Sequence, residues 1–186
     1  MRIRTIAFKW HVEAPIGAVE AVIRQLGFQL KKPSWERKVG GHVLAIEHRA
    51  RMSSSERSYF WLRFYQPASS ADKTLVSRAL SEWFYAMNGH FVTTVNWFQV
   101  AFDTEPIRTV HGYKQSSNSS IWTKVDKDST CFSVYPLYDY FLFEVRNLDI
   151  RNGIRHQLYA KWLDEVEFNI QGNEKPDDQI GFNLVG

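Results

Sequence analysis

Arginine and aromatic residues alternate with apolar ones in residues 44–52 and 57–65, two segments separated by a serine-rich turn. Such alternation predicts two half-buried strands of a hairpin. The positions expected to face the core are Leu44, Ile46, Ala50, Met52, Phe60, Leu62 and Phe64. Those expected on the other face are Glu47, Arg49, Arg51, Arg57, Tyr59, Trp61, Arg63 and Tyr65. Because rings stack on unpaired bases and guanidinium groups hold phosphates, this face predicts binding of single-stranded RNA or DNA.

This Arg/aromatic face is similar in outline to the binding surface of RNA-recognition domains, although the sequence lacks their glycine- and aromatic-rich motif. A second interpretation is that the C-terminal segment covers the face. The rings would then form a further core layer, with the arginines at its rim or paired with acidic residues.

The distribution of charge along the chain is compatible with both an open and a covered face. Residues 1–100 hold 14 Lys/Arg and 7 Asp/Glu, and residues 101–186 hold 9 and 13, which predicts an anionic partner for the first half or attraction between the halves.

A second pattern is Arg151-Asn152-Gly153-Ile154-Arg155-His156. This hexapeptide resembles the short motif of HEPN-type ribonucleases. The resemblance implies a metal-independent endoribonuclease in which Arg151 and His156 act on RNA at a dimer interface. It covers six of the 186 residues, and the same Arg-to-His spacing recurs from Arg37 to His42. The alternative is a helix surface on which Arg151 and His156 are solvated.

Acidic residues gather near the C-terminus. They are Asp164, Glu165, Glu167, Glu174, Asp177 and Asp178. A solvated helix face followed by a tail accounts for them, but an acidic segment can also mimic nucleic acid toward a basic protein. A protein-binding inhibitor or immunity module is therefore a further alternative. We expect a nucleic-acid-binding protein first, such as a subunit of a ribonucleoprotein or defence complex, and not an enzyme.

No cofactor or metal is expected. None of the six histidines has metal-ligand spacing to another, and the single cysteine, Cys131, excludes a thiolate zinc site and an internal disulfide. The sequence holds no phosphate loop, dinucleotide fingerprint or nucleophile elbow. It also lacks an apolar run of signal-peptide or membrane-spanning length. We therefore expect a cytoplasmic protein with no membrane partner, and the sequence leaves its oligomeric state open.

The elements that must position these residues follow from periodicity. Residues 5–12 alternate as a half-buried strand, and Pro15 and Gly27 bracket a helix. Residues 72–88 have helical spacing, and residues 91–102 are an apolar, β-rich run. With the hairpin between the helices, the order is β-α-β-β-α-β. That order predicts an α+β, ferredoxin-like fold, with a four-stranded antiparallel sheet and two helices on one face.

We expect residues 1–103 to form this core and residues 104–186 to pack on it as an elaboration, within one cooperative domain. In the second part, residues 120–125 and 130–135 predict a hairpin, and residues 149–168 predict a helix. Residues 137–145 fit a strand or a helix equally. The expected mutual core is Phe8, Trp10, Val19, Ile23, Leu44, Phe60, Leu62, Leu80 and Phe84.

Overall fold

The computed structural model describes residues 2–39, 42–49, 58–65, 73–104, 106–151 and 156–171. These residues form an α+β fold, as expected, with three helices and an 11-stranded sheet. The helices are α1 (Ile16–Gln25), α2 (Lys73–Asn88) and α3 (His156–Gln171). The strands are β1 (Arg2–Val12), β2 (Gln29–Lys31), β3 (Ser34–Val39), β4 (His42–Arg49), β5 (Ser58–Tyr65), β6 (Thr93–Asp103), β7 (Lys114–Gln115), β8 (Trp122–Val125), β9 (Cys131–Pro136), β10 (Tyr140–Arg146) and β11 (Ile150–Arg151).

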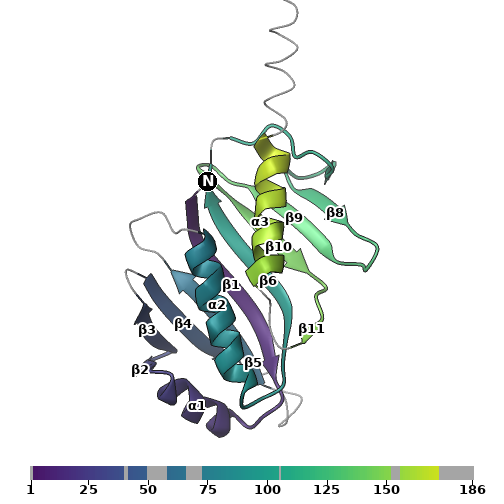
Figure 1. The fold of residues 1–186 in the computed structure, drawn as a ribbon. Coiled ribbons are helices and arrows are strands. Elements are labelled where there is room, and N and C mark those ends of the chain that lie inside the picture. The colour runs from purple at the N-terminus through teal and green to yellow at the C-terminus, as the bar shows by residue number, and fades with distance from the viewer. Residues whose placement is uncertain are drawn as a thin grey trace, which may run out of the picture.

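The sheet has the order β2-β3-β4-β5-β1-β6-β10-β9-β8-β7, and β11 pairs with β6 as well. Neighbouring strands in the described ranges are antiparallel, and β1 lies at the centre between β5 and β6. The helices lie together on one face of the sheet, with α2 beside α3 (Figure 1). No helix in the described ranges is long and apolar enough to cross a membrane.

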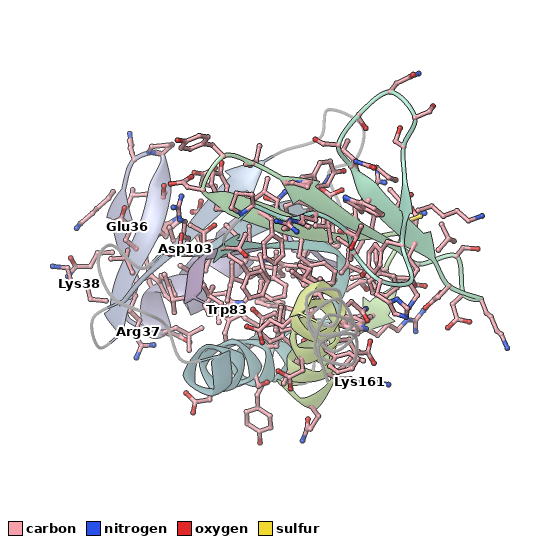
Figure 2. All side chains as sticks on the ribbon, turned by 90° about the horizontal axis from the view of Figure 1, so that it is seen from above. Glu36, Arg37, Lys38, Trp83, Asp103 and Lys161 are labelled. Atoms are coloured by element: carbon pink, nitrogen blue, oxygen red, sulfur yellow. The ribbon has the colours of Figure 1, made fainter. Side chains whose placement is uncertain are left out.

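The core lies between the sheet and the helices. Alternation in β1 buries Ile6, Phe8, Trp10 and Val12 on the helix side. The ring of Phe8 contacts that of Phe84 in α2 at 5.9 Å between centroids and that of Tyr159 in α3 at 6.0 Å. Figure 2 shows Trp83 between the sheet and α2, and its ring is 5.9 Å from that of Trp10. Aromatic packing therefore joins β1 to both long helices.

The ends of α1 follow its sequence. Pro15 precedes the first turn, where a missing N–H costs nothing, and Gly27 follows the last turn with a left-handed φ of 86°. The expected core residues with described side chains are confirmed as buried. They are Phe8, Trp10, Val19, Ile23, Leu44 and Phe84. The other three, Phe60, Leu62 and Leu80, have side chains outside the described set.

The sheet is larger than the four strands expected. Strands β2 and β3 form an additional hairpin beside β4, and β10 extends the sheet beyond β6. Residues 137–145 fitted a strand or a helix, and the structure shows a strand, β10, in which Tyr140 to Val145 pair with β6.

The helix expected over residues 149–168 begins later, at His156. Ile150 pairs with Val95 and Arg151 with Thr94, and the Leu148 N–H donates to the Asn96 carbonyl at 3.2 Å. Because β6 satisfies the backbone groups of this stretch, the chain stays extended there.

Candidate nucleic-acid interface

The predicted Arg/aromatic face includes β5. Pairing with β1 on one side and with β4 on the other determines the register of this strand. Phe60 and Leu62 pair with Trp10 and Phe8 of β1, which are buried on the helix side. Trp61 pairs with Lys9 on one side and Glu47 on the other. Cross-strand partners share a face and successive residues alternate, so Tyr59, Trp61, Arg63 and Tyr65 belong to the face opposite the helices. Arg49 is on this face too, because it pairs with Tyr59.

The other predicted site residues divide into two groups. Arg51 and Arg57 lie outside the described residues. Arg151 is the last residue of β11, at the edge of β6, and His156 is the first residue of α3. The segment joining Arg151 to His156 is outside the described residues.

The face opposite the helices, which we term the helix-free face, is half-exposed through its centre. Thr5, Ala7, Lys9 and His11 alternate with the buried residues of β1, and each is half-buried. Trp97 and Gln99 of β6 pair with Lys9 and Ala7 and are half-buried as well. In the described ranges all helices lie on the other side of the sheet (Figure 1). No described helix packs on the helix-free face, so its side chains contact mainly the adjacent side chains of the sheet.

Two arginines of this face are paired with carboxylates within the protein, and the first, Arg4, lies at the end where β1 begins and β6 ends. The Arg4 guanidinium donates to Asp103 and, at 2.9 Å, to Asp139, and it lies 4.6 Å from the centre of the Tyr140 ring. Hydrogen bonds to Asp139 and Asp103 raise the pKa of Arg4. Nearer the middle of the sheet, where Glu144 pairs with Gln99, Arg146 contacts the carboxylate of Glu144 at 3.0 Å. These arginines are consequently engaged by carboxylates that a phosphate would have to displace.

A pocket of about 520 Å³ opens at the opposite end of the helix-free face, where β1 ends and β6 begins. Its lining combines positively and negatively charged side chains with amide, hydroxyl and apolar groups. The lining residues are His11, Glu13, Val92, Thr94, Asn96, Leu148, Asp149 and Arg151. The volume is in the range of sites that bind small organic groups. We term it the His11 pocket.

The sheet register positions two of the pocket's side chains. Thr94 pairs with His11 across β1–β6 and with Arg151 across β6–β11. His11 and Arg151 therefore flank Thr94 on one face, with Cα atoms about 10 Å apart, twice the usual spacing of opposed residues. Glu13 and Asp149 are each two residues from one of them along the chain, and both are exposed.

A β-bulge positions a further pocket residue, Asn96. The register changes between the Lys9–Trp97 and Trp10–Val95 pairs, which leaves Asn96 as the extra residue of β6. A bulge turns a side chain away from its regular direction. The Asn96 Nδ2 atom lies 2.6 Å from His11 Nε2, while Asn96 Oδ1 is buried and has no hydrogen-bond partner among the described residues.

Sequence reasoning identified Arg151 but missed His11, Asn96 and the pocket that joins them. Alternation in β1 was a signal that His11 points to the same face as Lys9. Asn96 gave no signal, because a bulge has no sequence pattern of its own. Within the described ranges no three His, Cys, Asp or Glu side chains are grouped as metal ligands would be.

Comparison of the chain with protein-family models, with curated proteins and with solved structures finds no match. The function must therefore be inferred from the helix-free face and the His11 pocket themselves.

Proposed function

We propose that the protein binds single-stranded nucleic acid on the helix-free face of its sheet. Bases would stack on the rings of Tyr59, Trp61 and Tyr65, and the guanidinium groups of Arg49 and Arg63 would contact phosphates. One observation carries the proposal. The described helices occupy one face only, while the register of β5 assigns its arginine and aromatic positions to the other.

The arrangement of the second half of the chain supports an accessible face. Strands β8 to β10 extend the sheet edgewise beyond β6, and α3 packs beside α2 on the helix side. These elements therefore do not lie across β1 and β5. The half-exposed Lys9 and Trp97 at the centre of the same face are in keeping with this.

The composition of the face favours an unpaired strand over a duplex. Stacking requires base faces that are not already stacked on their neighbours, and a single strand can lie along a flat sheet. We further propose that β1, α1, β4, β5, α2 and β6 form a ferredoxin-like unit, to which the remaining strands are added at both edges.

The test is a titration of fluorescently labelled single-stranded RNA and DNA, followed by anisotropy at two salt concentrations. We expect saturable binding of both strands that weakens as salt rises, because phosphate contacts release counterions. The matched control is a duplex of the same sequence, which should bind less tightly. If neither strand binds at low salt, the proposal is wrong and the protein-binding alternative takes its place.

A further inference from the structure

The charges of the His11 pocket identify the kind of group it suits. Glu13 and Asp149 bring two carboxylates to its rim, against one guanidinium from Arg151. Among these three side chains negative charge is in excess, which disfavours a phosphate. A group that carries both hydrogen-bond donors and acceptors, and no charge, matches this lining better.

The remaining lining residues fit a flat ring. Val92 and the largely buried Leu148 supply apolar surface, while Thr94 and Asn96 add polar atoms. Asn96 Nδ2 lies 2.6 Å from His11 Nε2, and this contact holds both polar side chains at the pocket wall. Apolar walls with polar groups at one edge are how proteins hold an unstacked nucleobase.

The pocket also adjoins the proposed path of the strand. His11 is the cross-strand partner of Tyr59, which in turn pairs with Arg49 of β4. One residue of β1 therefore belongs to the pocket wall and lies next to the Arg/aromatic positions. A nucleotide leaving the stack on β5 would reach the pocket without crossing the core.

We propose that the His11 pocket binds one unpaired guanine base of the strand held on the helix-free face, an inference that rests on the proposed function. Guanine presents two neighbouring N–H groups, at N1 and N2, which suit a carboxylate from Asp149 or Glu13. It also presents two acceptors, O6 and N7, which suit the Arg151 guanidinium. Cytosine lacks the pair of neighbouring N–H groups, and adenine and uracil lack both pairs.

The experiment measures base preference separately from strand binding. The probes are labelled uridine oligomers of about a dozen nucleotides, the length of a typical single-strand site, with guanine, inosine, adenine or cytosine at one central position. We expect the guanine oligomer to bind about tenfold more tightly than the all-uridine one, which corresponds to about 1.4 kcal/mol. Inosine, which lacks the N2 amine, should lose much of that ratio.

Two variants test the assignment of residues. Arg151→Ala and the double variant Glu13→Gln/Asp149→Asn should each bring the guanine-to-uridine ratio close to one. All three side chains are exposed, so the fold should tolerate these changes. The matched controls are Arg108→Ala and Asp128→Asn, which alter exposed charges outside the pocket and should preserve the ratio.

The outcomes separate this inference from the proposed function. Binding of every oligomer with no preference for guanine overturns the base pocket and leaves the helix-free face as the site. A preference that survives in both pocket variants also overturns the assignment. If no oligomer binds, the proposed function is wrong and the base pocket is wrong with it.

Discussion

Asn96 Nδ2 and His11 Nε2 lie 2.6 Å apart across the β1–β6 pair, although 85 residues separate them in the chain. The contact exists because the bulge at Asn96 turns its amide toward the neighbouring strand. The amide holds the imidazole ring at the pocket wall. The pocket is thus built from a backbone irregularity as much as from its residue types.

The first prediction concerns stacking. Trp61→Ala should weaken binding of single-stranded RNA by about 1–3 kcal/mol, because one base loses its stacking surface. Anisotropy titration measures the change. Tyr85→Ala is the matched control, since Tyr85 is 84% exposed on α2, on the other side of the sheet. Equal losses for Trp61→Ala and Tyr85→Ala would contradict a stacking role for β5.

The second prediction concerns phosphate contacts. Arg49→Ala and Arg63→Ala should weaken binding of all sequences alike, and each should reduce the slope of log affinity against log salt by about one. Titrations at several salt concentrations give that slope. Arg108→Ala, which removes an exposed positive charge from the loop after β6, should leave the slope unchanged. A similar change for Arg108→Ala would mean that only overall charge matters.

The third prediction distinguishes binding from cleavage. Under the proposed function, RNA incubated with the protein stays intact on a denaturing gel, and His156→Ala binds as the wild-type protein does. Under the HEPN-type ribonuclease interpretation, the wild-type protein cleaves RNA and His156→Ala abolishes cleavage. Cleavage with that dependence would replace our proposal with the ribonuclease one.

The fourth prediction concerns the core and uses two neighbouring residues of α2. Phe84 is 2% exposed and its ring contacts those of Phe8 and Trp10, whereas Tyr85 points to solvent. Phe84→Ala should lower the free energy of unfolding by about 3–5 kcal/mol, because it leaves a cavity between α2 and β1. Tyr85→Ala should change it by about 0.5 kcal/mol or less. Urea denaturation followed by tryptophan fluorescence measures both, and similar values would contradict the orientation of α2.

The fifth prediction concerns alkaline pH. Burial raises the pKa of Tyr159 well above its usual value, and burial, with a contribution from Glu165, also raises that of Tyr113. Above about pH 10 a tyrosine in the unfolded chain loses its proton while these two keep theirs, so the free energy of unfolding falls as the pH rises.

Tyr159→Phe removes one of these two contributions and should make the fall with pH less steep. At neutral pH the change should cost little, since the Tyr159 hydroxyl has no hydrogen-bond partner among the described residues. Urea denaturation at pH 7 and at about pH 10.5 tests both statements. An unchanged dependence on pH would show that Tyr159 does not keep its proton in the folded state.

The sequence predicted the elements whose signals are local. Alternation identified the strands β1 and β5, and Pro15 and Gly27 marked the ends of α1. It did not predict the β2–β3 hairpin, because the three residues of β2 are exposed and show no alternation. It also assigned Ile150 to a helix, since helical spacing from Ile150 onward cannot reveal that β6 is available as a pairing partner.

The candidate site likewise has one part that the sequence could predict and one part that it could not. The Arg/aromatic positions of β5 are a local pattern and could be read from alternation alone. The His11 pocket depends on pairing between β1, β6 and β11, and on a bulge that shifts register by one residue. Such features are set by contacts between distant segments, so neither composition nor spacing could reveal them.

The central position of β1 has a consequence for synthesis of the protein. This strand is synthesised before its two partners, β5 and β6, which end only at Tyr65 and Asp103. At usual rates of translation the nascent chain must carry Phe8 and Trp10 without their strand partners for on the order of 10 s. During that interval an apolar strand with both edges open can pair with other chains. A chaperone that shields extended apolar segments should therefore raise the yield of folded protein.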